Sequence, residues 1–334
     1  MGSSANSAVP ASPAFLVRYR ASADARERMP FDRFMALALY DEHVGYYRQA
    51  RERVGRDANT DFYTATTTGP IFGELIEAAA AKLLGEGTQL SDHLFVEIGT
   101  ENPGGIQAGR QSAFKAVRTL PLGRALEIEG PCVVFSNELF DAQPCRRFVH
   151  RDGTWLELGV QLVGEALQEI VWAPAERAPY LPARAPEGYC VDAPEAAVEL
   201  LRTILSQPWH GLFLACDYGK SWAEMINSVP AGTVRAYHRH QQTTDLLARP
   251  GEQDLTCHVC WDWLQTALLE AGCSTPNLES QEAFLVRHAA GVLAATVHRE
   301  SAGLSPRKQA LLQLIHPAHM GQKFQVLHAR RPAR

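Results

Sequence analysis

Four acidic residues occur at or just beyond the ends of short apolar runs, where they could take part in binding or catalysis. They are Glu97, Glu138, Asp141 and Asp217, and the runs cover residues 94–98, 132–135 and 212–216. Buried parallel strands have this pattern, and ligands of open α/β sheets bind beyond the carboxyl ends of such strands. The four carboxylates would then converge at one edge and suit a cationic or hydroxyl-rich ligand, such as a guanidinium held by two hydrogen bonds. They would equally serve as loop caps and solvated strand ends, and both interpretations stay open.

Motifs of other enzyme classes are incomplete. Residues 219–221 (Gly-Lys-Ser) resemble the end of a phosphate-binding loop, but position 214 is Leu where that loop needs Gly. No Gly-x-Ser-x-Gly sequence is present, which excludes the commonest serine hydrolase design. Gly99 and Gly104 half-match a dinucleotide fingerprint, but Glu101 replaces its middle glycine. Nucleoside triphosphatase and nicotinamide dehydrogenase activities are therefore not expected.

Cysteine and histidine residues near position 250 have some features of a zinc site. Cys257 and Cys260 form a Cys-x-x-Cys pair, with His238 and His240 upstream. A second pair at zinc-finger spacing is missing, and cysteines commonly fill small core positions. We therefore predict no metal site. The seven cysteines follow no disulfide framework, which indicates a reducing compartment.

Composition narrows the class of protein. The chain has 334 residues, 46% of them hydrophobic and 21% charged, which is ordinary for a globular protein. A net charge of −5 argues against non-specific nucleic-acid binding. No apolar stretch approaches the roughly 18 residues of a membrane helix. We expect a soluble protein of the bacterial cytoplasm, or of the mitochondrial matrix if the source is eukaryotic, with no nucleic-acid or membrane partner.

The periodicity of apolar residues predicts the elements that carry these side chains. We expect a disordered N-terminus over 1–29, a helical N-terminal cap over 30–90 with helices near 31–39 and 72–83, and an α/β domain over 91–334. An insertion over about 148–190 contains a hairpin turning at Asp152-Gly153. Asp192 is predicted to cap a helix that continues to Leu205. A further helix is expected over 263–271 and a last strand over 324–327.

An ordered series of short motifs extends over about residues 30–328. The blocks cover 34–41 with 45–47, 61–64 with 72–74, 96–99, 136–144, 217–219, 233–237 with 240, 250–259, and 281 with 284–285. The most specific block is 136–144, Ser-Asn-Glu-Leu-Phe-Asp-Ala-Gln-Pro. Together they resemble the MidA family of class I methyltransferases, which includes the mitochondrial arginine methyltransferase that assists assembly of respiratory complex I.

This resemblance implies a Rossmann-like class I methyltransferase sheet that binds S-adenosyl-L-methionine. It implies a protein substrate, methylated on arginine in mitochondrial members, and an active site lined by the loop after the second apolar run. The implied catalytic residues are Asn137, Glu138 and Asp141. The implied cofactor-binding residues are Gly73, Glu97, Gly99, Glu127, Asn137 and Asp217. The alternative is a catalytically impaired scaffold or assembly factor that keeps the fold and binds a protein partner.

The chain departs from that family in its cofactor-binding half. Glu101 occupies a position where such enzymes usually have Gly, and Pro103 removes a backbone donor. Only 37 residues separate Gly99 from Asn137, and one βαβ crossover takes about 30 residues. We therefore expect one crossover to be shortened and one strand to be missing or reduced to residues 125–129, with Glu127 or Glu129 replacing the acid that holds the ribose.

Overall fold

The computed structural model of the chain describes residues 10–49, 65–100, 102–123, 125–175, 178–299, 303 and 305–333. The chain forms two compact units, each built from three separate segments. The first unit comprises residues 1–63, 142–197 and 220–258, and the second comprises 64–141, 198–219 and 259–334. Each domain predicted from the sequence was one continuous segment, whereas each of these units combines three segments that alternate along the chain. None of the helices in the described ranges is long and apolar enough to cross a membrane.

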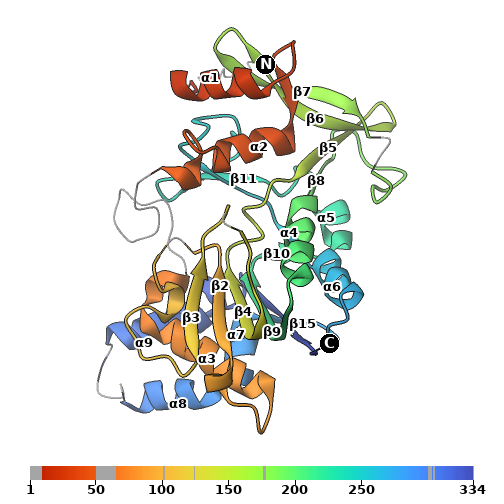
Figure 1. Cartoon of the computed structure of the whole chain (residues 1–334). Helices are drawn as coiled ribbons and strands as arrows, with labels where there is room; N and C mark the ends of the chain where they lie inside the picture. The colour runs from red at the N-terminus through yellow and green to blue at the C-terminus, as the bar shows by residue number, and fades with distance from the viewer. Residues whose placement is uncertain are drawn as a thin grey trace. The chain divides into compact units, whose positions relative to one another are not determined.

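Among the described residues, the second unit has a six-stranded sheet with the order β15-β16-β9-β4-β2-β3 (Figure 1). The strands are β2 (Leu94–Ile98), β3 (Ala116–Leu120), β4 (Gly130–Asn137), β9 (Trp209–Asp217), β15 (Asn277–Ser280) and β16 (Gln325–Arg331). The neighbours β3, β2, β4 and β9 are parallel, whereas β16 and β15 are antiparallel to their neighbours. The apolar runs form the central strands, which confirms the predicted α/β fold with a parallel sheet.

Helices cover both faces of this sheet. Consecutive residues of β4 and β9 are therefore buried. Figure 1 shows α3, α8 and α9 on the left of the sheet and α4 and α6 on its right. The bounds are α3 (Pro70–Leu84), α4 (Glu195–Ser206), α6 (Trp261–Glu270), α7 (Gln281–His288), α8 (Ala290–Arg299) and α9 (Pro306–Ile315). The helix predicted near 72–83 is confirmed as α3. It begins at Pro70 and ends before Gly85, which has a positive φ, and a proline at the start and a glycine after the end are the usual sequence signals of helix termini.

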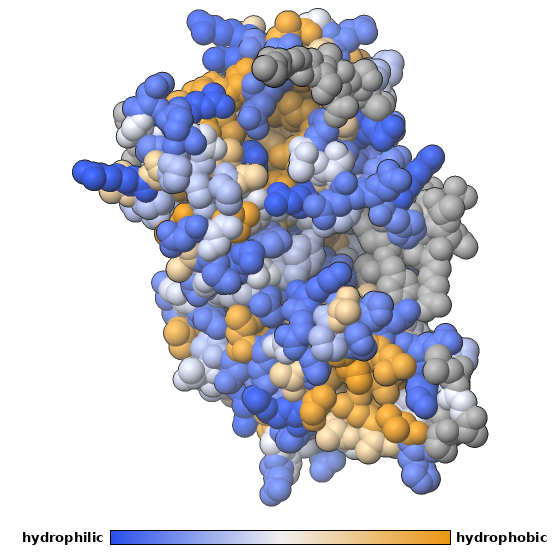
Figure 2. Space-filling model, turned by 180° about the vertical axis from the view of Figure 1, so that it is seen from behind, coloured by the Kyte–Doolittle hydropathy of each residue, from blue (hydrophilic) through white to orange (hydrophobic). Residues whose placement is uncertain are grey.

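The helices α7, α8 and α9 leave apolar side chains on the surface of the second unit. Figure 2 shows an apolar area low on the right of the molecule. Val286, Val297 and Leu312, one from each helix, are 51%, 52% and 41% exposed. Among the side chains of α8, Thr296 is the buried one. This helix therefore contributes little to the core.

Both connections around β3 lack an α-helix in their described residues. Among the described residues between β2 and β3, the 3-10 helix Gly105–Gln107 is the one helical element, and residues 121–123 and 125–129 are irregular. Two helix-free crossovers fit into the 37 residues between Gly99 and Asn137. The shortened crossover is therefore confirmed, but the strand placed at 125–129 was wrong, because the strand beside β2 is Ala116–Leu120.

The first unit contains, in its described residues, a five-stranded antiparallel sheet of β1, β6, β5 and β8 with β7 paired to β6. Its elements are α1 (Pro13–Ser22), β1 (Arg28–Pro30), α2 (Phe31–Tyr40), β5 (Arg146–Arg151), β6 (Thr154–Val163), β7 (Ala166–Pro174), β8 (Cys190–Ala193), α5 (Trp222–Ser228), β11 (Arg235–His238), β12 (Gln241–Thr243) and β13 (Asp254–Thr256). The short strands β10 (Gly219–Lys220) and β14 (Val259–Cys260) lie where the chain passes between units. The hairpin predicted at Asp152-Gly153 is confirmed, with both residues at positive φ as a two-residue turn requires.

Two predictions for the first unit were wrong. Residues 13–22 form helix α1 instead of a disordered tail, because Ser12 caps the first turn and Phe15 and Tyr19 are fully buried on one face. Asp192 lies in strand β8 and caps no helix. Its carboxylate pairs with Arg147 at 2.7 Å and accepts the N–H groups of residues 233 and 234. Asp192 therefore serves as the ion-pair partner of the buried Arg147 and as an acceptor for the backbone at residues 233 and 234.

Candidate functional site

The carboxyl ends of β2, β4 and β9 lie at one level of the sheet. Ile98 is aligned with Ser136 in β4, and Asn137 is aligned with Cys216 in β9. The loops that leave these strands therefore start side by side. The structure brings to this edge the predicted site residues Gly99, Asn137, Glu138, Asp141 and Asp217. The convergence expected from the parallel-strand pattern is observed.

Asp217 holds the loop that follows β4. Its Oδ2 accepts hydrogen bonds from the backbone N–H groups of Phe140 (2.9 Å) and Asp141 (3.3 Å), and its Oδ1 accepts one from Tyr218 (2.8 Å). The residue is fully buried. Burial, together with the neighbouring Asp141, raises the pKa of Asp217 well above its usual range. Asp217 therefore acts on the site by fixing the backbone at residues 140 and 141.

Glu138 has a strained backbone at the start of this loop. Its φ is +50°, a left-handed conformation that side chains other than glycine rarely adopt. Its N–H donates to the Cys216 carbonyl at 2.9 Å, and its Oε1 accepts a hydrogen bond from Asn137 Nδ2 at 2.9 Å. Among the described residues, the buried Asn137 Oδ1 has no hydrogen-bond partner. Strain and a spare acceptor at one strand end are typical of a functional site.

Glu97 fixes the loop that follows β2. Its side chain is buried, and its Oε2 accepts the N–H of Ile106 at 2.8 Å. A Cβ atom on Gly105 would overlap this carboxylate, so glycine is needed where the loop crosses it. Burial raises the pKa of Glu97 to about 7, and the hydrogen bond from Ile106 lowers it only in part.

Two other predicted glycines allow close packing around the same loop. Gly99 adopts φ +86° directly after β2, and a Cβ there would collide with Leu139. Gly73 of α3 faces the 3-10 turn after β2, where a Cβ would overlap the Ile106 carbonyl and where Gln107 Nε2 donates to the Gly73 carbonyl at 3.4 Å. The helix and the turn thus pack backbone to backbone, and the strand end packs against the Leu139 side chain.

Glu127 does not join the other carboxylates. Its side chain is 77% exposed and lies 3.5 Å from Arg118. Arg118 is aligned with Val96, in the middle of β2, so this pair is removed from the strand ends. Strand β3 ends at Leu120, and Pro121 and Leu122 follow it, so no acidic residue occurs directly at the end of this strand. Glu101, which occupies a position where such enzymes usually have Gly, lies outside the described residues.

Comparison with known proteins identifies the family. A family model described as "putative S-adenosyl-L-methionine-dependent methyltransferase" matches residues 106–278, more than half of the chain. The chain belongs to this family. It is a methyltransferase that depends on S-adenosyl-L-methionine, and the result is consistent with the resemblance to MidA proteins. No curated protein matches the chain.

Solved structures support the fold of this methyltransferase. A Burkholderia thailandensis protein crystallised with S-adenosyl-homocysteine is 26% identical, with a TM-score of 0.79 over 97% of this chain and 95% of that one. A native structure from the same superfamily and organism is 24% identical, with a TM-score of 0.76 and the same coverage. The expected class I methyltransferase fold and its cofactor are thereby confirmed.

The residues at the strand ends of the methyltransferase fit a cationic cofactor. The charged groups that raise the pKa of the buried Cys216 thiol, beyond burial itself, are the carboxylates of Asp217, Glu138 and Glu97. The oxygens of these groups offer acceptors to an ammonium or hydroxyl group, and any of them that is ionised favours a sulfonium. The spare Asn137 oxygen offers an acceptor to an N–H or O–H donor. The donor set therefore suits S-adenosyl-L-methionine, although no acid follows β3.

Sequence reasoning missed the groups that hold these carboxylates. The N–H groups of Phe140 and Ile106 and the side chain of Leu139 act through backbone position and packing, for which the sequence carries no signal. The cysteines weighed as zinc ligands, Cys257 and Cys260, are buried. In the part of the chain that the structure describes, the side chains whose potential metal-ligand atoms lie close together are those of Glu279, His288 and His328, in the second unit.

Proposed function

We propose that this methyltransferase methylates the guanidinium group of an arginine side chain in a protein. The observation that carries the proposal is the group of carboxylates around Glu138, Asp141 and Asp217 at the carboxyl edge of the sheet. A guanidinium is planar, always charged and recognised by carboxylates through paired hydrogen bonds. A site with several carboxyl groups favours such an acceptor over an anionic or apolar one.

Glu138 and Asp141 are assigned to the acceptor. They occur on one short loop whose backbone is held by Asp217, so their carboxylates are positioned before the substrate binds. One of them orients the guanidinium nitrogen. The other receives the proton that this nitrogen loses when its bond to the methyl carbon forms and the carbon–sulfur bond breaks.

Bound S-adenosyl-L-methionine would supply the electrophilic methyl group. Asn137, through its free Oδ1, and the backbone at Gly99 are the groups assigned to contact it. Gly73, Glu97 and Asp217 are assigned to holding the loops after β2 and β4 in position. Glu97 and Asp217 do so by accepting backbone N–H groups, and Gly73 by its close contact with the Ile106 carbonyl. Glu127 is left out of the proposed site, because it is exposed and paired with Arg118.

The test separates cofactor binding from methyl transfer. Calorimetric titration with S-adenosyl-homocysteine measures binding, and transfer of tritiated methyl groups to arginine-containing and matched lysine-containing peptides measures catalysis. Glu138→Gln and Asp141→Asn remove the charges, and Glu86→Gln, on an exposed loop, is the matched control. We expect both site variants to bind the ligand within about threefold of the wild type and to lose methyl transfer by roughly 100-fold or more.

Three results would contradict the proposal. Methylation of lysine peptides alone would exclude arginine as the acceptor. Loss of ligand binding in Asp141→Asn would make that residue part of the cofactor site. Unchanged transfer in both variants, with the control also unchanged, would remove the acidic loop from catalysis.

A further inference from the structure

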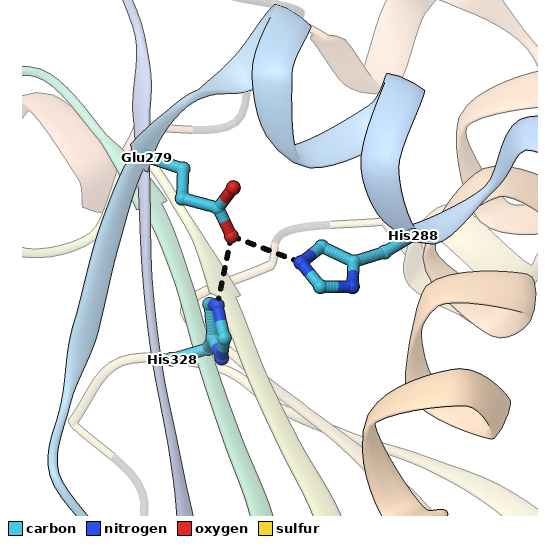
Figure 3. Close-up of side chains that lie close together, drawn as sticks. All are labelled: Glu279, His288 and His328. Carbon is cyan, nitrogen blue, oxygen red and sulfur yellow. Dashed lines mark hydrogen bonds and ion pairs between the residues drawn. The ribbon is translucent and has the colours of Figure 1, made fainter.

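Three side chains from separate elements meet beneath helix α7. Glu279 lies in β15, His288 ends α7, and His328 lies in β16 (Figure 3). The Glu279 Oε1 atom is 2.9 Å from Nε2 of His288 and 3.1 Å from Nε2 of His328. All three ligand atoms lie within 4.8 Å of one another. Figure 3 shows both imidazole rings directed at the same carboxylate oxygen.

The surroundings hold these side chains in place. The exposed fractions of the Glu279, His288 and His328 side chains are 8%, 10% and 7%. The fully buried Phe284 ring packs against both imidazoles, with centroids at 5.0 and 5.6 Å. On the outer side, Arg287 binds Glu279 Oε2 at 2.6 Å, which leaves Oε1 for the histidines. A hydrophobic wall and an ion-paired outer oxygen help to hold the three side chains in place.

We propose that Glu279, His288 and His328 bind one divalent transition-metal ion, with zinc the ion that best suits the ligands. Two imidazole nitrogens and one carboxylate oxygen are a borderline-soft set, which suits zinc better than magnesium or calcium. Three protein ligands leave a fourth position for water. Sequence analysis assigned no metal to this chain, and these three residues carry no recognisable spacing motif.

The ligand atoms need only small adjustments to accept the ion. Zinc bonds of about 2.0–2.1 Å place tetrahedral ligand atoms about 3.4 Å apart, so the two oxygen–nitrogen separations must open by a few tenths of an ångström, and the two Nε2 atoms already lie within 4.8 Å of each other. Each Nε2 must present a lone pair instead of a proton. Glu279 Oε1 accepts the Nε2 protons, so the ion must displace them, and His288 Nδ1, which has no hydrogen-bond partner among the described residues, can carry the proton of that ring instead.

The ion would stabilise the C-terminal part of the second unit. It would join β15, β16 and the end of α7, which are separated by up to 49 residues in sequence. His328 is aligned with Leu214, three residues before Asp217 in β9, and is therefore about 10 Å from the strand ends. The proposed site therefore lies apart from the strand-end carboxylates, and the inference does not depend on the identity of the methyl acceptor.

The experiment uses the full-length protein after treatment with EDTA and gel filtration. Zn²⁺ is titrated by calorimetry, and Co²⁺ is added as a spectroscopic probe of coordination geometry. Glu279→Gln, His288→Gln and His328→Gln remove one ligand each, and His298→Gln on the exposed end of α8 is the matched control. Circular dichroism of the metal-free proteins checks that each variant folds.

We expect one Zn²⁺ per chain and a visible Co²⁺ spectrum of tetrahedral type. Each ligand variant should weaken zinc binding by at least about 100-fold, while His298→Gln binds as the wild type does. Zinc should raise the unfolding temperature of the wild type and the control only. Absence of both zinc binding and the Co²⁺ spectrum in the wild type would overturn the proposal, whether or not the variants fold. Binding that survives in folded His288→Gln and His328→Gln proteins would overturn it as well.

Discussion

Replacing Glu97 with Gln should stabilise the protein at high pH and leave it nearly unchanged at low pH. Glu97 is 2% exposed, and burial raises its pKa from 4.5 to about 7. Below pH 4.5 the carboxyl is protonated in both the folded and the unfolded protein. Between pH 4.5 and about 7 the unfolded chain releases this proton while the folded protein keeps it, so stability is lost over this window and the loss is complete above pH 7. One pKa unit corresponds to about 1.4 kcal/mol, so the full loss is about 3 kcal/mol.

Urea unfolding of the wild type and Glu97→Gln at pH 4.5 and pH 8.5 measures this effect. The six tryptophans provide the fluorescence signal, and comparing the two proteins at each pH cancels all other titrations. Gln keeps an oxygen that can accept the Ile106 N–H, so the loop should stay in place. We expect a gain of about 3 kcal/mol at pH 8.5 and little change at pH 4.5, with the exposed Glu86→Gln neutral at both. An equal effect at both pH values would refute the reasoning.

Three further substitutions test other parts of the structure. Gly105→Ala places a Cβ against the Glu97 carboxylate at a positive φ and should cost about 1–3 kcal/mol in urea unfolding; an unchanged midpoint would contradict the packing. Asp192→Ala strands the buried Arg147 and should cost roughly 3–5 kcal/mol, measured by the same assay, whereas a loss below 1 kcal/mol would refute the buried pair. Glu127→Gln should change stability by less than about 0.5 kcal/mol and leave calorimetric affinity for S-adenosyl-homocysteine unchanged; weaker binding would return this residue to the cofactor site.

The central strands could be predicted because they are buried on both faces. Strand β2 has the predicted bounds, since a continuous apolar run marks a buried parallel strand. Strand β3 was missed because it lies at the sheet edge, where Arg118 and Thr119 interrupt the apolar pattern. Helix α1 was missed because its buried Phe15 and Tyr19 are surrounded by arginines, and burial of its apolar face became visible only in the fold.

The candidate site was predictable only to the level of which carboxylates share an edge. Parallel strand order brings Glu138 and Asp217 together, and that follows from the pattern of the sequence. The backbone groups that Asp217 binds, and the fit of Gly105 over Glu97, depend on loop conformation. The Glu279–His328 contact depends on the register of two antiparallel strands, and a shift of one residue would turn a side chain to the other face.

The connection after β2, which has no α-helix in its described residues, explains why a buried carboxylate persists beside the carboxyl edge of the sheet. A crossover helix would normally fix the start of this loop and satisfy its backbone groups within the helix. Here Glu97 accepts the Ile106 N–H, and Gly73 and Gly105 let the turn approach the strand and α3. The neutral acid, present below its pKa of about 7, does this at little electrostatic cost, whereas the ionised form costs stability. A glutamine would accept the Ile106 N–H equally well, so a structural role alone does not require the titratable group.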